Sequence, residues 1–387
     1  MDEGTVVRHR SLLGVLGLAW TTTVAGCLGQ ACDGPSGDPP KKSAKRVVSA
    51  ASNAATRSST SAPSSSAPTA LQPGDAGGDA ASLPEPPAGG PPVVPKATGQ
   101  ALIDLVLAGL PPPREPLAEK EMAFLRRSIG PGSFGSMNQG NPEIAKHSIS
   151  RGRCLGGLRG VTLQSPEQRK QCQGYDLMVP VYANGDAASA KVCIDVFEFP
   201  NRPCELPFVW ASATQADRVC KKLGKRLCTQ DEWVAACSAD PAGGEPSNYA
   251  YGDELDLTAC NTNRAKRDYQ EERCDPTSVK STWKTCVTYT APSGAFPRCR
   301  SRLGVFDQHG NVAEAMTRYE PKEERTVSQL KGSAFFYVDV HRRLKDKPEK
   351  ATYPDHCAHD PRWHVQPMTK AWHVNYHLGF RCCLSLD

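Results

Sequence analysis

The chain has 387 residues, with 46 Lys and Arg against 41 Asp and Glu, which gives a formal charge of +5. Only 39% of the residues are hydrophobic, while Gly and Pro number 33 each, so part of the chain is not expected to enter a folded core. Beyond the N-terminal segment there is no run of about 18 apolar residues, which excludes a multispanning membrane protein. The positive charge is mild and scattered, which argues against a dedicated nucleic-acid binder.

The first residues have the order of an export signal. A basic start at 8–10 precedes a short apolar stretch at 12–20, which is typical of a signal peptide rather than a spanning helix. Residues 24–27, Val-Ala-Gly-Cys, then resemble the lipobox of bacterial lipoproteins. The resemblance implies a lipoprotein signal peptide over 1–26 and a lipid-bearing Cys27. An ordinary cleaved signal or an uncleaved anchor is the alternative.

The lipid anchor implies a location as well. The protein is expected to be exported and held on a membrane face of the bacterial cell envelope. Leu28 follows the cysteine where some lipoproteins have Asp, and this resembles the pattern of lipoproteins sent to the outer membrane or cell surface.

Two further segments precede the main domain. Residues 27–99 are rich in Ser, Ala, Pro and Gly and cannot bury enough apolar surface to offset chain entropy, so they are predicted to form a disordered tether. Residues 100–150 form an N-terminal extension with brief helical patterns at 100–109 and 117–128. The GPGSFG run at 130–135 matches the spacing of a dinucleotide-binding loop but lacks a preceding strand, so a flexible connector is expected.

Residues 151–387 have the composition of one cysteine-rich domain. All sixteen cysteines except Cys27 and Cys32 lie there. Their spacings are too wide for zinc knuckles, and an even number permits full pairing, so disulfides are favoured over zinc.

The regular elements expected in this domain are few, which indicates an irregular, loop-rich α+β fold. Alternating apolar residues predict a strand at 192–199. Capping-box patterns predict helices over 212–223 and from residue 229 to 237. The clearest late strands are predicted at 332–340 and 378–386.

Five segments in sequence order resemble the motifs of one family. They are GKRLCTQDEW at 224–233, YGD at 251–253, GVFDQHGNVAE at 304–314, GS at 332–333 and GFRC at 379–382. They resemble the GKRLPTExEW, PWG, GLYDxxGNVWE, GGS and GFRC motifs of the formylglycine-generating enzyme (sulfatase-modifying factor) family. The resemblance implies a C-type-lectin-like fold with little regular structure.

The same resemblance argues against the family's catalytic activity. Catalytic members bind copper(I) through two cysteines shortly after the GGS strand, because copper(I) needs soft thiolate ligands. Counting from the GS pair places these positions at Phe336 and His341. Counting back from Cys357 places them at Lys347 and Thr352. Neither register supplies a cysteine pair, so copper is not expected.

The family also implies two disulfides and a calcium site. The disulfides join Cys220 to Cys382 and Cys237 to Cys357. The implied calcium ligands are the side chain of Asp307 and the main-chain oxygens of Gln308, Gly310 and Val312. Oxygen ligands from a tight loop suit a hard ion. Alternatively, the Asp307, Asn311 and Glu314 side chains only hydrogen-bond the loop backbone. A second family site is matched less clearly by Asn261 and Thr262.

Six of the nine histidines lie between residues 341 and 377. His356 and His359 are spaced to share zinc, iron or copper, with Cys357 beside them if that cysteine is unpaired. Alternatively, these histidines pack against tryptophans such as Trp363 and Trp372.

Three functions follow from these observations. The preferred one is a tethered, catalytically degenerate family member that binds a protein, peptide or glycan. A metal-dependent oxidoreductase that uses the histidines is the first alternative, and true formylglycine generation is the second.

Overall fold

The computed structural model describes residues 98–111, 117–130, 135–147, 149–264, 274–275, 277–337, 356–360 and 365–386. All of them belong to one of the two units into which the chain divides, residues 82–387. The predicted signal peptide, Cys27 and nearly all of the predicted tether lie outside the described residues. The same is true of His341, Lys347, Thr352 and most of the GPGSFG run. Within the described ranges, no helix is long and apolar enough to cross a membrane.

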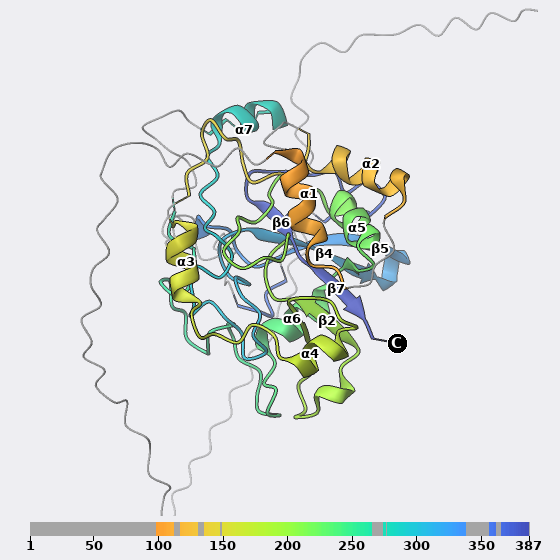
Figure 1. Ribbon diagram of the computed structural model, residues 1–387, viewed down its shortest axis with the longest axis vertical. Coiled ribbons are helices and arrows are strands. Elements are labelled where there is room, and N and C mark those ends of the chain that lie inside the picture. Colours follow the sequence, from red (N-terminus) through yellow and green to blue (C-terminus); the bar gives the residue numbers. More distant parts are fainter. Residues whose placement is uncertain are drawn as a thin grey trace, which may run out of the picture. The chain divides into compact units, whose positions relative to one another are not determined.

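Two small β-sheets meet at the C-terminal segment (Figure 1). The antiparallel sheet has the order β1 (Met178–Pro180), β2 (Val192–Asp195), β7 (Cys382–Ser385) and β3 (Arg226–Leu227). The second sheet has the order β5 (Arg325–Lys331), β4 (Ala313–Glu320) and β6 (Leu378–Phe380). Strand β4 pairs antiparallel with β5 and parallel with β6. Because only Arg381 separates β6 from β7, this segment ties the two sheets together.

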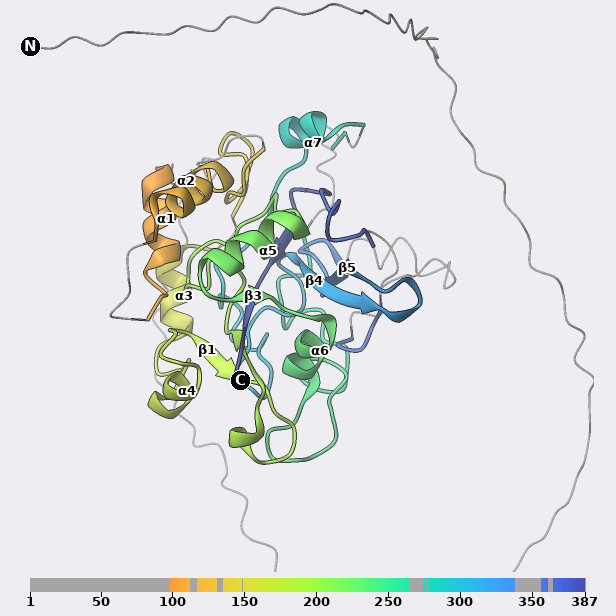
Figure 2. The same cartoon turned by 90° about the vertical axis from the view of Figure 1, so that its right-hand side faces the viewer.

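Short helices surround the sheets (Figure 1, Figure 2). They are α1 (Gly99–Leu107), α2 (Glu119–Ser128), α3 (Arg151–Gly157), α4 (Pro166–Gln171), α5 (Ala213–Lys222), α6 (Gln230–Ser238) and α7 (Val279–Thr285), with 3-10 turns η1 (Ala187–Ser189) and η2 (Pro321–Glu323). The described part is thus an irregular, loop-rich α+β fold, as the sequence predicts.

The two predicted helix starts behave differently. At α6 the capping box is complete, since the Thr229 hydroxyl accepts from the Glu232 amide and the Glu232 carboxylate accepts from the Thr229 amide. At α5 the Ser212 hydroxyl accepts from the Gln215 amide, but the Gln215 side chain donates to the Ser128 carbonyl at the end of α2. The second half of the predicted box is therefore replaced by a link between two helices.

The predicted strand at 332–340 is wrong over its described part. Strand β5 ends at Lys331, residues 332–337 contain no strand and turn at 335–336, and 338–340 lie outside the described residues. Gly332 has φ +67, and a Cβ there would lie 2.7 Å from the Gln308 carbonyl oxygen. This close approach to the 304–314 loop ends the strand. The strand predicted at 192–199 is shorter, and the one at 378–386 is split at Arg381.

The N-terminal extension contributes to the core of the domain. Ile103 on α1 and Leu125 on α2 are fully buried in one apolar cluster with Phe208 and Phe380. Burying an aliphatic side chain of this size stabilises the fold by about 1.5–3 kcal/mol. Helices α1, α2 and α5 consequently lie side by side on one flank of the sheets (Figure 1, Figure 2).

Seven disulfides use all fourteen cysteines from Cys154 onward. They are Cys154–Cys204, Cys172–Cys193, Cys220–Cys382, Cys228–Cys383, Cys237–Cys357, Cys260–Cys299 and Cys274–Cys286. Two of them, Cys220–Cys382 and Cys237–Cys357, are the pairs that the family resemblance implies. The described residues therefore offer no free thiolate for zinc or copper.

Candidate functional site

The 304–314 loop, one of the family motifs, is held from both sides. Asp307 and Asn311 both have a left-handed backbone, with φ of 58° and 55°. Between them, Gly310 (φ +72) lies so near the Asn261 carbonyl oxygen that a Cβ would come within 2.4 Å of it. The Asn311 amide donates to the same carbonyl at 2.9 Å. Glycine is required here because no side chain fits between the loop and its neighbour.

Four charged side chains lie buried at this loop: its own Asp307 and Glu314, and Glu198 and Arg381 from other segments. The Arg381 guanidinium makes two 2.6 Å bonds to the Glu314 carboxylate and one of 2.9 Å to the Phe306 carbonyl. Glu198 accepts from the Val312 amide at 3.0 Å, and Asp307 accepts from the Gly294 amide at 2.6 Å. Three carboxyl groups thus lie near one guanidinium, which hydrogen-bonds only the Glu314 carboxylate directly.

The pKa values of two of these carboxyl groups are raised. Burial raises the pKa of Asp307 to about 7, although the Gly294 amide and Arg381 oppose the shift. Burial, together with the nearby Asp307 and Glu314 charges, raises the pKa of Glu198 well above its ordinary value. Burial is the main cause of both shifts, and the neighbouring carboxyl groups add to it; a bound cation would favour the charged forms.

The predicted calcium ligands fit a hard cation by chemistry and charge. Asp307 supplies a buried carboxylate, and its neighbour Gln308 has a buried Oε1 atom without a hydrogen-bond donor among the described residues. The Gln308 amide nitrogen, however, donates to the Trp233 carbonyl, away from the Asp307 partner Gly294. The two side chains therefore point to different neighbours, and the loop carbonyls of Gln308, Gly310 and Val312 would have to complete a cage.

The alternative account of the loop also has support. The Asn311 side chain bridges Glu198 and the Ala291 main chain, and its Oδ1 accepts from the Asn261 amide group. The side chains of Asp307, Asn311 and Glu314 all have protein partners. Asn261 therefore packs against the loop and hydrogen-bonds to it. The Thr262 hydroxyl donates to the Leu257 carbonyl.

The first predicted copper position belongs to an aromatic cluster. Phe336 is 5% exposed, and its ring lies 4.8 Å from His377, 5.3 Å from Phe335 and 6.3 Å from Tyr376. An apolar ring in van der Waals contact with other rings offers no lone pair to a metal. The second position, His341, lies outside the described residues.

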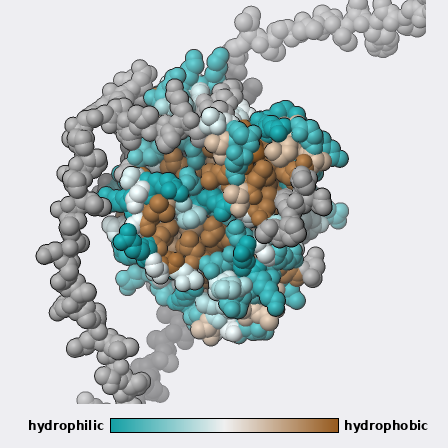
Figure 3. Space-filling view, in the orientation of Figure 1, coloured by the Kyte–Doolittle hydropathy of each residue, from teal (hydrophilic) through white to brown (hydrophobic). Residues whose placement is uncertain are grey.

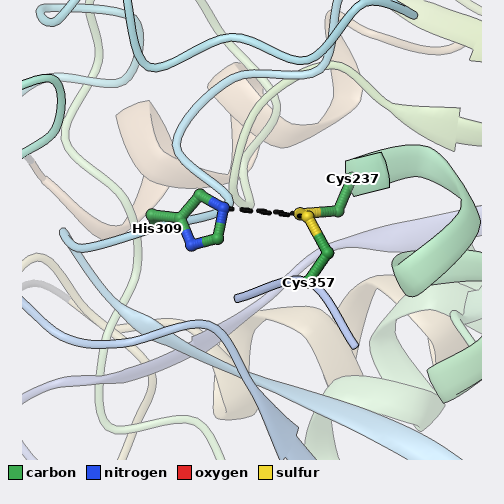
Figure 4. A group of neighbouring side chains, drawn as sticks. All are labelled: Cys237, His309 and Cys357. Atoms are coloured by element: carbon green, nitrogen blue, oxygen red, sulfur yellow. Dashed lines mark hydrogen bonds between the residues drawn. A yellow bond between two sulfur atoms is a disulfide. The ribbon is translucent and has the colours of Figure 1, made fainter. Parts of the chain in front are cut away.

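A histidine lies directly against one disulfide (Figure 4). The His309 Nε2 atom is 3.4 Å from the Cys237 sulfur and 3.9 Å from the Cys357 sulfur. The potential ligand atoms of these three residues lie within 4.8 Å of one another. Because the two sulfurs are bonded together, they are not thiolates, and Nε2 already accepts from the Ala250 amide at 3.0 Å. The group is therefore closed to metal while the disulfide is intact.

The predicted pair His356 and His359 lies next to this disulfide. Their ring centroids are 5.7 Å apart. The buried Lys331 ammonium donates to the carbonyls of Cys357 and His359, and so fixes this turn. Cys357 is bonded to Cys237, so the condition for its thiolate to join the histidines is not met.

Comparison with known proteins identifies the family of the domain. The model of the sulfatase-modifying factor enzyme 1-like domain matches residues 161–386, more than half of the chain. The chain belongs to this family. No curated protein matches the sequence. Among solved structures, the crystal structure of CarF is similar at 14% identity, covering 47% of this chain and 68% of that chain, with a TM-score of 0.28.

The family motifs did not reveal every member of the buried charge group. Glu198 lies outside the motifs that carry the resemblance, within a mostly apolar segment that the sequence predicts as a strand and that also contains Asp195. A carboxylate in such a segment is the signal that could have found it, because charged residues are rarely buried without a partner. Arg381 is part of the GFRC motif, but its partner Glu314 is 67 positions away along the chain.

Proposed function

We propose that this protein is an extracytoplasmic, membrane-tethered member of the family that binds a ligand or protein and lacks formylglycine-generating activity. The packing of Phe336 at the first copper position carries the proposal, because an aromatic cluster occupies the place of a thiolate. The pairing of all fourteen cysteines in the domain supports it. A C-type-lectin-like surface, which the family resemblance implies, would suit a protein, peptide or glycan ligand.

A direct assay tests the missing activity. The purified protein is supplied with copper(I), oxygen and a cysteine-containing sulfatase peptide, and the peptide mass is followed. We expect no conversion of cysteine to formylglycine, with an active family member as the positive control. Conversion by this chain would overturn the proposal.

Calcium is proposed as a structural ion of the 304–314 loop. The Asp307 carboxylate and the carbonyls of Gln308, Gly310 and Val312 would hold it, and its charge would offset the buried carboxyl groups. We expect a chelator to lower the melting temperature and calcium to restore it. Asp307→Asn should abolish that response, whereas Asp253→Asn, on the surface, should preserve it. An unchanged melting temperature in the wild type would leave the loop held by hydrogen bonds alone.

A metal-dependent oxidoreductase is the second candidate. The grouping of Cys237, His309 and Cys357 favours it, because reduction of the disulfide would create two soft thiolates beside an imidazole. Metal analysis before and after mild reduction tests this. Retention of a transition metal by the unreduced protein would favour a site elsewhere, such as His356 and His359.

A further inference from the structure

A pocket of about 310 Å³ lies between helices α2 and α5, the start of α7 and the segment before β6. Its lining residues are Phe124, Ser128, Gly135, Trp210, Ser212, Gln215, Arg218, Val279, Trp372 and Val374. Phe124 and Ser128 precede the region matched by the family model, so the pocket combines the family domain with this chain's own extension.

The rim of the pocket exposes large apolar side chains. Trp372 is 57% exposed and Val279 is 44% exposed, which makes them two of the few large hydrophobic residues on the described surface. On the face drawn in Figure 3, apolar residues form separate patches among polar ones. Exposed aromatic surface beside a hollow is typical of a ligand site rather than of ordinary surface.

The inner wall is rigid. Trp210 is buried and has a left-handed backbone with φ of 62°, a conformation that is rare for a bulky residue. Its amide donates to the Asn375 carbonyl at 3.0 Å, and its ring packs edge-on against Trp283 at 5.2 Å. Such a conformation persists where the surroundings over-determine it, and it is found at ligand clamps. The conformation of this wall is therefore fixed before a ligand binds.

The pocket lining offers a ligand the Arg218 guanidinium and the Trp210 Nε1 atom, which is buried and has no hydrogen-bond partner among the described residues. The Ser212 hydroxyl caps α5, and the Gln215 amide is bonded to the Ser128 carbonyl. Among the described lining residues, Arg218 has the only formal charge. Its guanidinium carbon lies 5.9 Å from the Trp372 ring centroid, and the adjacent acid Asp217 is paired with Lys221 instead.

We propose that this pocket binds a small amphipathic organic anion, with a flat apolar body against the two tryptophans and a carboxylate at Arg218. The volume is at the lower end of the range for small-molecule sites, and an apolar lining with one oriented charge is the usual composition. The inference rests on the proposed binding function and specifies the ligand class.

Two probes of equal shape test the charge. Binding of 3-phenylpropionate and of its neutral amide, 3-phenylpropionamide, is measured by calorimetry on the full chain. We expect the anion to bind about fivefold more tightly, the upper range for an exposed ion pair. Arg218→Gln should reduce the anion to the affinity of the amide, and Trp372→Ala should weaken both probes. Arg298→Gln, at an exposed arginine outside the pocket, should change neither.

Several results would overturn the inference. If neither probe binds, the proposed site is refuted. If the acid and the amide bind equally, the proposed preference for an anion is refuted. An unchanged anion affinity in Arg218→Gln would exclude this arginine as the partner. The cysteine-peptide assay reads the proposed loss of catalytic activity separately. Failure of the pocket and failure of that proposal are therefore distinguishable.

Discussion

Arg381 is the side chain on which the centre of the domain most depends. Its guanidinium is fully buried, and it joins Glu314 on β4 to the carbonyls of Asp195 and Phe306. The neighbouring acid groups raise the pKa of Arg381 above its ordinary value, against the effect of burial. One planar donor therefore holds β4, the end of β2 and the 304–314 loop in a fixed relation.

Arg381→Lys is expected to destabilise the protein strongly. A lysine keeps the charge but cannot reproduce the planar set of donors, so buried acceptors lose their partners. Loss of a partner in a buried ion pair costs about 3–5 kcal/mol. The midpoint of urea unfolding measures the effect. Arg298→Lys, in the exposed pair with Asp256, should leave the midpoint nearly unchanged. Equal effects of the two variants would contradict this account.

His147 gives the fold a dependence on pH. Its Nδ1 atom lies 2.9 Å from the Thr290 carbonyl, and burial lowers its pKa below the ordinary value of 6.5. The unfolded chain therefore binds a proton at a higher pH than the folded chain does. Stability from the neutral ring is fully present above pH 6.5 and is lost as the pH falls towards the lower folded pKa.

His147→Gln should flatten this part of the pH profile. Urea midpoints at pH 7.5 and pH 5.5 are compared for the wild type and the variant, and the wild type should lose more on acidification. Arg298→Gln, at an exposed arginine, is the control and should keep the wild-type slope. An identical slope for His147→Gln would assign the acid sensitivity to other groups.

Disulfides between distant elements should stabilise the fold more than local ones. Cys220 on α5 and Cys382 on β7 are 162 positions apart, whereas Cys274 and Cys286 are separated by 12. In the chain-entropy model a longer loop restricts the unfolded state more. The bridge Cys228–Cys383 joins the same two segments, so both bridges must be removed to release the long connection.

The test replaces each pair with alanines. The variant with Cys220, Cys228, Cys382 and Cys383 all replaced by alanine should lose roughly 6 kcal/mol of unfolding free energy, and the Cys274→Ala and Cys286→Ala double variant about 3 kcal/mol. Denaturant unfolding of both proteins measures the difference. A larger loss for the short loop would show that packing, and not chain entropy, dominates.

The sequence correctly predicted those elements whose stabilising contacts lie between residues close together in the chain. The helix after Thr229 begins at its capping box, because both partners lie within one turn. The box at Ser212 is only half formed, because Gln215 finds a carbonyl on a helix far away in sequence. The strand predicted after Gly332 fails for a similar reason, since contact with Gln308 depends on the folded loop.

The residues of the candidate sites also differ in whether local sequence could predict them. Sequence motifs located Asp307 and the 304–314 loop, because the spacing of these residues is local. Glu198 and Arg381 are brought to that loop by sheet pairing and could not be placed beforehand. The pocket around Trp210 and Trp372 depends on four separate segments, so no single stretch of sequence predicts it.

The predicted anchor concerns the molecule as a whole. If Cys27 carries acyl chains, two or more chains are sufficient for stable membrane attachment. Full-length protein expressed in a bacterium should sediment with membranes, and Cys27→Ser should move it to the soluble fraction. Cys32→Ser, within the same predicted tether, should behave as the wild type. Membrane sedimentation of Cys27→Ser would indicate an uncleaved anchor instead.

Three disulfides join the C-terminal part of the domain to residues 220–237. The three bridges are Cys220–Cys382, Cys228–Cys383 and Cys237–Cys357. A protease that nicks the backbone once, anywhere between Cys237 and Cys357, leaves two fragments that are still covalently joined. On a gel without reductant such a nicked molecule migrates as one species, and only reduction releases the pieces. In an environment rich in proteases, a cut of this kind would not by itself dismantle the domain.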